Sequence, residues 1–326
     1  MLKDSFNRTI DYLRVSITDR CSLRCLYCMP PEGVEWKPND NILTYEQILR
    51  ITRTAAGLGI RKIKVTGGEP LLRRGMSALL KEIKTIKGIE KVTLTTNGIL
   101  LGSYIDGAEP TDTASLPDSI NISLNALDTE RYRSMTRCRN AEPAAILPVI
   151  DRLLEKQITV KINCVILRSV NEEEILPLTA LAKDKNIVVR FIELMPIGSA
   201  SGLQFVSGTE ITERIKKAFG NLAPFDGIAG NGPAVYYSLY GFTGKIGFIN
   251  AVTHGFCETC NRLRLTSEGF LKLCLFNDAG IDLRELIQNG ADDHELADAI
   301  TEAAAVKPRS YGAAEQRGES MSEIGG

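Results

Sequence analysis

The 326-residue sequence is poor in histidine and nearly neutral. Only two histidines, His254 and His294, are available as metal ligands. A net charge of −1 gives no general attraction to nucleic acid or to a membrane surface, so any anionic ligand must meet local clusters of arginine and lysine. No apolar run is long enough to span a membrane, and residues 1–8 contain no signal-like apolar segment. We therefore expect a cytoplasmic protein that binds neither nucleic acid nor membrane.

The composition that remains, 44% hydrophobic and 24% charged residues, is that of an ordinary globular protein. Eight cysteines are present, and six of them fall into two tight groups. Disulfides are rare in a reducing compartment, so grouped cysteines favour metal binding. Cys138 and Cys164 stand apart from both groups, and we expect them to be inert packing residues.

The first thiol group, Cys21, Cys25 and Cys28, has three and then two residues between successive cysteines, with Tyr27 just before the third. Thiolates bind iron–sulfur clusters and zinc. Three thiolates leave one position open, on a four-iron cube or on a tetrahedral ion. An open position of this kind is where chemistry can occur.

The second thiol group, Cys257, Cys260 and Cys274, repeats the incomplete set of three. A CxxC pair with a further cysteine at hairpin distance is often a zinc site. A closed structural zinc site needs four ligands, however, and only His254 is placed to supply the fourth. Zinc and iron–sulfur interpretations both stay open on this pattern.

Short β-branched runs alternate with amphipathic stretches over the first two thirds of the chain, which predicts parallel βα units. Thr44 is placed to cap a helix that ends at Gly57 and Gly59. Six units are fewer than the eight of a closed barrel, so we predict an α/β fold with an open, partial (β/α)6 TIM-like barrel. The predicted strands are Tyr12–Thr18, Lys62–Thr66, Lys91–Thr96, Ser119–Leu124, Thr159–Leu167 and Val188–Leu194, and the other helices are Met76–Ile86, Pro143–Glu155 and Glu172–Lys183.

The regular alternation of strand-like and helix-like stretches ends near residue 200, which predicts a barrel over residues 1–200 and a C-terminal region over 201–326. Later strands at hairpin spacing predict a small antiparallel extension. Gly102–Asp118 is rich in turn residues and is predicted as an irregular loop. The predicted C-terminal strands are Val235–Tyr240, Lys245–Asn250, Arg262–Thr266 and Phe270–Leu275, followed by helices at Leu283–Gln288 and His294–Val306 and an extended tail.

Cations alternate with apolar residues on several predicted strands. Arg262 and Arg264 flank Leu263, so both guanidinium groups lie on one face of the strand. Such a pair is either a solvated strand face or a polyphosphate site. Burying many cations inside a barrel is costly without counter-charge, so the whole set predicts a cavity that admits an anion. The other members are Arg14, Lys62, Lys64, Lys161 and Arg190.

Gly67-Gly68-Glu69-Pro70 directly follows a predicted strand. It is either a tight turn or a place where the backbone can approach a small ligand. Ser123 and Thr95 end their strands and are either turn caps or ligand hydroxyls, while Met195 by composition is a core residue.

The spacing of the first thiol group, the glycine pair and the six βα units together resemble the radical S-adenosylmethionine (SAM) superfamily. Further stretches resemble its GTP 3′,8-cyclase family, which acts in molybdenum cofactor biosynthesis. They are Asp11–Arg14, Val65–Arg73, Arg190–Pro196, Phe256–Arg264 and the terminal Gly325-Gly326. The resemblance implies that a 5′-deoxyadenosyl radical removes the ribose C3′ hydrogen of GTP, after which C3′ attacks guanine C8 to give (8S)-3′,8-cyclo-7,8-dihydroguanosine 5′-triphosphate.

The resemblance also implies two 4Fe–4S clusters, a SAM site and a GTP site, and it assigns individual residues to each of them. It implies that Gly325-Gly326 enters the active site. By position, the ligands of the first cluster match Cys21, Cys25 and Cys28, and those of the second match Cys257, Cys260 and Cys274. The SAM contacts match Tyr27, Gly68, Ser123 and Met195. The GTP contacts match Arg14, Lys64, Thr95, Lys161, Arg262, Leu263 and Arg264, of which Arg14, Arg262 and Arg264 match the catalytic residues.

Implied partners are GTP, a flavodoxin- or ferredoxin-like one-electron donor and, by pathway, a cyclic pyranopterin monophosphate synthase; a homodimer is an option. Lys64 and Asn125 stand where the family often has Arg and Asp, and we expect them to tune affinity. Two alternatives remain: a twin-cluster radical SAM enzyme that acts on a peptide or another small molecule, and a zinc-stabilised module that binds nucleic acid.

Overall fold

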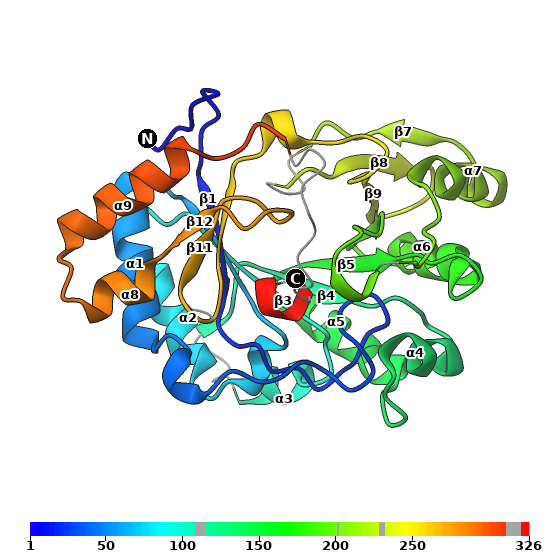
Figure 1. Cartoon of the computed structure of the whole chain (residues 1–326). Coiled ribbons are helices and arrows are strands. Elements are labelled where there is room, and N and C mark those ends of the chain that lie inside the picture. The colour runs from blue at the N-terminus through cyan, green and yellow to red at the C-terminus, as the bar shows by residue number, and fades with distance from the viewer. Residues whose placement is uncertain (108–114, 201, 228–231, 311–320, 326) are drawn as a thin grey trace.

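Six strands form at the β-branched runs that the sequence predicts, in a computed structural model of the chain (Figure 1). The structure describes residues 1–107, 115–200, 202–227, 232–310 and 321–325. Each strand pairs in parallel with the next, as the alternation with helices requires. The six are β1 (Tyr12–Ser16), β2 (Lys62–Thr66), β3 (Lys91–Thr96), β4 (Ser119–Ser123), β5 (Thr159–Val165) and β6 (Val188–Ile192).

The C-terminal strands extend this sheet at both of its edges. β9 pairs in parallel with β6, and β10 pairs in parallel with β1. Antiparallel strands then continue outward on each side, so the antiparallel extension predicted from hairpin spacing is in fact divided between two edges. The added strands are β7 (Leu222–Pro224), β8 (Val235–Leu239), β9 (Lys245–Ile249), β10 (Arg262–Leu265), β11 (Phe270–Lys272) and β12 (Gly280–Asp282).

The resulting sheet has twelve strands in the order β12-β11-β10-β1-β2-β3-β4-β5-β6-β9-β8-β7. β12 and β7 are its two edges as described, so the predicted open, partial TIM-like barrel is confirmed. Apolar residues such as Leu13 and Val15 on β1 are buried on the outer face, where the helices pack. Figure 1 shows α1, α8 and α9 together at the left of the molecule and α6 and α7 at the right.

The helices begin and end largely where their capping residues predict. Thr44 and Gln47 form a capping box at the start of α1, and Gly59, with a positive φ, ends it, while Gly57 lies inside the helix. The helices are α1 (Tyr45–Leu58), α2 (Met76–Thr85), α3 (Leu101–Asp106), α4 (Thr129–Thr136), α5 (Leu147–Glu155), α6 (Ile175–Asp184), α7 (Gly208–Phe219), α8 (Leu283–Gln288), α9 (Asp293–Ala305) and α10 (Met321–Ile324).

The irregular loop predicted over Gly102–Asp118 is wrong at its start, because α3 forms there. Leu101 and Ile105 are both buried in the core, so their packing outweighs the low helix propensity of the neighbouring Gly102 and Ser103. Residues 108–114 of that segment lie outside the described residues. The tail predicted as extended contains the short helix α10, and residues 311–320 and Gly326 also lie outside the description.

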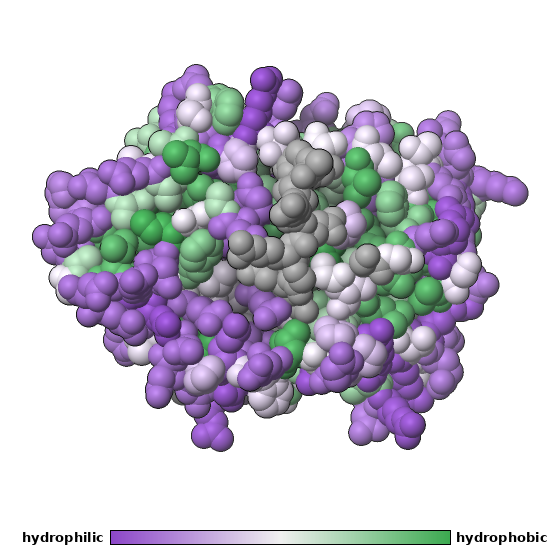
Figure 2. All heavy atoms as spheres, viewed as in Figure 1, coloured by the Kyte–Doolittle hydropathy of each residue, from purple (hydrophilic) through white to green (hydrophobic). Residues whose placement is uncertain are grey.

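The surface in the view of Figure 1 is largely hydrophilic, with hydrophobic residues scattered over it (Figure 2). Within the described ranges, no helix is both long and apolar enough to cross a bilayer. The C-terminal helix α10 lies in front of β3 and β4 in Figure 1. Contacts of α10 with the first thiol group place it at the end of the barrel where the strands terminate.

Candidate active site

One cavity at the carboxyl ends of the parallel strands gathers most of the side chains that the sequence singles out. Strands β1 to β6, the C-terminal region and Met321 of α10 all contribute to its wall. The predicted residues that line it are Arg14, Tyr27, Lys64, Thr95, Ser123, Met195, Cys257, Cys260, Arg262, Arg264 and Cys274. Cys21, Cys25, Cys28, Gly68, Lys161 and Leu263 are not among the described residues of that wall. Lys62 of the predicted cation set is also absent from it and instead pairs with Asp11 over 3.0 Å.

Strand register places three cations of the cavity side by side. Arg14 on β1 stands opposite Arg264 on β10 and opposite Lys64 on β2. Burial, reinforced by the neighbouring cations, lowers the pKa of Lys64 and Arg264, and burial lowers that of Arg14 to about 10. Charged groups held together in this way repel one another and are poorly hydrated. The row is therefore suited to a bound polyanion.

Lys161 and Leu263 take positions different from the rest of the predicted GTP contacts. Lys161 is 4% exposed, and burial together with the nearby Arg190 lowers its pKa to about 7. The Leu263 side chain is buried in the core on the face of β10 opposite Arg262 and Arg264. Any contact between Leu263 and a ligand in the cavity would therefore have to come from its main chain.

The first thiol group lies in the loop that follows β1. The Cys28 N–H donates to the Cys25 carbonyl over 2.9 Å. Burial raises the pKa of Cys25 and raises that of Cys28 to about 12, and repulsion between the neighbouring thiolates adds to both shifts. Because burial disfavours the ionised form of each of these half-buried thiols, a cationic centre is needed for all three to be thiolates together.

The glycine pair packs directly behind this loop. A Cβ on Gly68 would lie 2.4 Å from the Arg20 carbonyl oxygen, which leaves no space for a side chain. The Gly68 N–H donates to the Thr18 carbonyl, and the Glu69 N–H donates to the Arg20 carbonyl, both over 2.7 Å. Gly68 thus has a structural role in holding the loop of the first thiol group against the end of β2.

Tyr27 is held by Asn125, one of the two positions where the chain departs from the family pattern. The Asn125 amide Nδ2 donates to the Tyr27 hydroxyl over 3.0 Å, while its Oδ1 accepts from the Val165 N–H over 2.9 Å. Because Asn125 is the donor, the Tyr27 hydrogen is directed elsewhere. Tyr27, Ser123 and Asn125 all line the cavity.

The C-terminal tail reaches both predicted sites. The Met321 N–H donates to the Cys28 carbonyl, and Ser322 lies beside the Cys28 thiol, where its polar groups partly offset the rise in that thiol's pKa. Arg264 Nη1 donates to the Gly325 carbonyl over 3.0 Å. The described end of the chain therefore lies between the first thiol group and the row of cations.

The second thiol group is more electropositive than the first. Burial acts to raise the pKa of Cys260, but Arg262 and Lys307 outweigh it, and that pKa falls to about 7. The Arg262 guanidinium also lies 4.7 Å from the centre of the Phe256 ring. A thiol that ionises near neutrality is ready to bind a metal centre.

Lys307 and Glu193 were not identified from the sequence. Lys307 is 2% exposed and lines the cavity, but it follows α9 where only a polar tail was predicted. Glu193 is buried and accepts hydrogen bonds from the Val252 and Thr253 N–H groups, which fixes the segment before Cys257. No short-range pattern marks either residue, because their partners are distant in the sequence.

Neither thiol group forms a preassembled single-ion site within the described part of the chain. Among the described residues, no three Cys, His, Asp or Glu side chains are spaced to hold one metal ion. A single zinc ion draws its ligands to within about 2.3 Å, whereas each thiolate of a cube binds a separate iron. His254, the candidate fourth zinc ligand, is exposed and lies 3.1 Å from the Thr253 hydroxyl through Nδ1.

Two family models match the chain in succession. Residues 15–182 match the model of the radical SAM superfamily, and residues 187–313 match that of the molybdenum cofactor synthesis C family. The first match covers about half of the chain and contains the first thiol group and the glycine pair. The open barrel and its thiol loop thus belong to a radical SAM enzyme.

Curated relatives narrow this class. The chain is 44% identical over 310 residues to a GTP 3′,8-cyclase of Clostridium perfringens, covering 95% of this chain and 94% of the relative. It is 43% identical over 330 residues to a GTP 3′,8-cyclase of Moorella thermoacetica, with both chains fully covered. The chain belongs to the GTP 3′,8-cyclase family.

Solved structures agree on the fold. SuiB of Streptococcus suis bound to S-adenosylmethionine has a TM-score of 0.56 and 15% identity, covering 89% of this chain and 68% of that one. Another crystal structure of Streptococcus suis SuiB has a TM-score of 0.57 and 17% identity, covering 90% of this chain and 68% of that one. At these identities the likeness concerns the fold alone.

Proposed function

We propose that this chain is a radical SAM lyase that converts GTP to (8S)-3′,8-cyclo-7,8-dihydroguanosine 5′-triphosphate in molybdenum cofactor biosynthesis. The observation that carries the proposal is the composition of the cavity wall. Arg14, Lys64 and Arg264 form a row on one side, and the second thiol group lies at the same wall. A nucleoside triphosphate combines the polyanion that the row suits with a base that an open metal position can bind.

The first thiol group would hold a 4Fe–4S cluster, which with SAM supplies the 5′-deoxyadenosyl radical that removes the ribose C3′ hydrogen of GTP. Tyr27, Ser123 and Met195 line the cavity and would contact SAM. Gly68 lies behind the thiol loop, so its contribution to SAM binding would come through the backbone it holds in place.

We assign GTP contacts to Arg14, Lys64, Thr95, Lys161, Leu263, Arg262 and Arg264. Arg14, Arg262 and Arg264 are the proposed catalytic residues, and all three line the cavity. Their forks would orient the triphosphate and so hold the ribose in one position. Arg190, buried and bonded to Asn121 over 2.7 Å, would add to the charge of the wall.

We further propose a second 4Fe–4S cluster on Cys257, Cys260 and Cys274, whose open iron would face the guanine. A flavodoxin- or ferredoxin-like protein would supply single electrons, and a cyclic pyranopterin monophosphate synthase would consume the product. The division into a barrel of residues 1–200 and a C-terminal region of 201–326, and a homodimeric state, belong to the same proposal.

Anaerobic reconstitution with iron, sulfide, dithionite and SAM tests the function. Each nucleoside triphosphate is supplied in turn, and 5′-deoxyadenosine and any new nucleotide are measured. We expect a cyclic product with GTP only, and we expect Cys21→Ala to abolish all SAM cleavage. Product formation that does not depend on GTP would contradict the proposal.

A further inference from the structure

Arg8 lies where three segments distant in sequence meet, outside the cavity wall. It is 9% exposed, and its Nε donates to the fully buried Asp4 carboxylate over 2.5 Å. Its Nη1 donates to the Cys257 carbonyl over 2.6 Å. The remaining bonds run to the segment after α9, with Nη2 donating to the Pro308 carbonyl over 2.7 Å and Nη1 to the Arg309 carbonyl over 3.0 Å.

Lys307 makes a second link of the same kind. Its Nζ donates to the carbonyl of Leu273, the residue directly before Cys274. Its own carbonyl accepts from Arg8 Nη2 over 3.4 Å. Through Arg8 and Lys307, the main chain of Cys257 is thus linked to that of Leu273, the neighbour of Cys274. We call Asp4, Arg8 and Lys307 the N-terminal clasp.

Packing alone does not fix the loop that the clasp holds. The turn Cys257–Thr259 contains no buried residue, so its position depends on hydrogen bonds. The Cys257 carbonyl accepts from Arg8 and also from the Cys260 N–H, over 3.1 Å. Figure 1 shows the N-terminal segment and the chain leaving α9 at the same end of the molecule.

We propose that Arg8 is a positioning residue that sets the second thiol group to the spacing its metal centre needs. One planar fork whose donors reach the Asp4 carboxylate and the carbonyls of two other segments defines a fixed arrangement, which a flexible ammonium group does not. This inference rests on the proposed second cluster. The alternative is that Arg8 merely ties the N-terminus down and contributes to stability in general.

The two cases are separated by measuring iron and cluster spectra in reconstituted full-length protein. The parent should hold about eight irons per chain, four in each cluster. We expect Arg8→Gln to hold about four and to lose the electron paramagnetic resonance signal that Cys257→Ala also loses. SAM cleavage by the first cluster should persist, while formation of the cyclic product falls. Arg8→Lys should recover the second cluster only in part.

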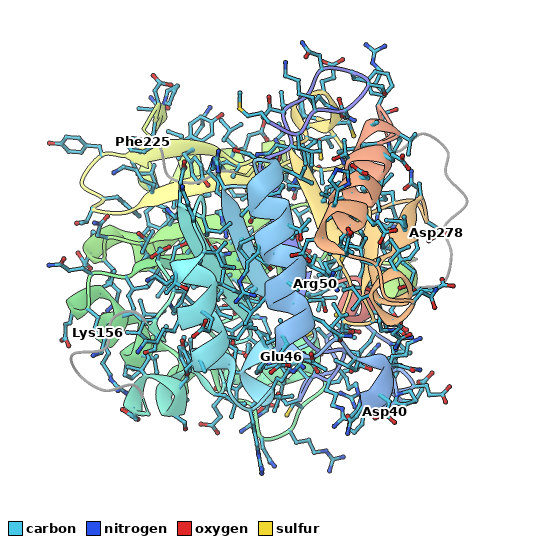
Figure 3. The ribbon with its side chains drawn as sticks, turned by 90° about the vertical axis from the view of Figure 1, so that its left-hand side faces the viewer. Asp40, Glu46, Arg50, Lys156, Phe225 and Asp278 are labelled. Carbon is cyan, nitrogen blue, oxygen red and sulfur yellow. The ribbon has the colours of Figure 1, made fainter. Side chains whose placement is uncertain are left out.

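Arg50→Gln is the matched control. Arg50 on α1, labelled in Figure 3, also joins a carboxylate and a main-chain carbonyl, since it donates to Asp293 over 2.7 Å and to Ala291 over 2.6 Å. It touches no cysteine in these bonds, so its loss should lower the melting temperature and leave about eight irons. Lys307→Met, which keeps the Arg8 fork, gives a second variant if Arg8→Gln does not fold, and it too should lose iron from the second cluster.

The inference is overturned if Arg8→Gln and Lys307→Met keep about eight irons and the parent spectrum, or if Arg50→Gln loses iron to the same extent. Failure of the underlying proposal gives a different result, namely a parent protein with only about four irons. In that case there is no second cluster for Arg8 to position, and both ideas fall together.

Discussion

Replacing Lys161 by methionine should stabilise the ligand-free protein while weakening its binding of GTP. Lys161 is 4% exposed, and burial next to Arg190 lowers its pKa from 10.5 to about 7. Each tenfold change in proton affinity corresponds to about 1.4 kcal/mol. The charged lysine therefore costs the ligand-free fold on the order of 4 kcal/mol at pH 7, which the uncharged side chain avoids.

The sign of the pH dependence follows from the direction of the shift. Below pH 7 both the folded and the unfolded lysine carry the proton, so the full cost is present. Between about pH 7 and pH 10.5 the unfolded chain binds more protons than the folded one, so stability rises with pH. The advantage of Lys161→Met should thus be largest at pH 6 and should fall by about half at pH 9.

The assay is urea unfolding of reconstituted protein under anaerobic conditions, with and without GTP. If Lys161 contacts GTP as proposed, a bound triphosphate would supply the missing counter-charge, so GTP should stabilise the parent more than it stabilises the variant. Lys217→Met on the exposed face of α7 is the control and should change the free energy of unfolding by about 0.5 kcal/mol or less. A Lys161→Met variant that is no more stable than the parent at pH 6 would refute the reasoning.

Three further outcomes can be measured. Asn125→Asp turns the donor facing Tyr27 into an acceptor that engages the phenol hydrogen. SAM affinity should then fall about fivefold, which corresponds to the loss of one hydrogen bond of about 1 kcal/mol. Unchanged SAM affinity in an equilibrium binding measurement would contradict this prediction. Gly68→Ala forces a Cβ against the Arg20 carbonyl and should remove the first cluster, leaving about four irons; retention of both clusters would count against the role given to Gly68. Gly325→Ala places a Cβ 2.9 Å from Ser16 at a φ of +79°, so cyclic product should fall while SAM binding, measured at equilibrium, persists; full product formation would contradict it.

The parts of the fold that the sequence predicts well are those governed by local rules. β2 and β3 begin and end at the predicted residues, and the Thr44 cap starts α1, because side-chain alternation and capping depend on neighbours in sequence. The parallel pairing of β9 with β6 and of β10 with β1 depends on which edge of the barrel each strand reaches. Hairpin spacing carries no such information.

The residues of the candidate site likewise divide into those that local sequence patterns predict and those that only the three-dimensional structure reveals. Alternation along β10 correctly separates Arg262 and Arg264 from Leu263, whose side chain joins the core. The contacts of Arg8 to Cys257 and Arg309 span 249 and 301 residues, and the bond from Lys307 to Leu273 spans 34, so neither residue leaves a periodic trace from which it could be predicted. Strand alternation predicts the cation set but does not distinguish its members: Lys64 lines the cavity, whereas Lys62 pairs with Asp11 and Lys161 is not part of the described wall.

The most direct test of the central claim is the fate of one hydrogen. GTP carrying deuterium at ribose C3′ is supplied to the reconstituted protein with SAM and dithionite, and the 5′-deoxyadenosine is analysed by mass spectrometry. The account predicts that this 5′-deoxyadenosine contains deuterium and that the cyclic nucleotide forms in step with it. 5′-Deoxyadenosine without deuterium, formed while labelled GTP is converted to the cyclic nucleotide, would contradict the account.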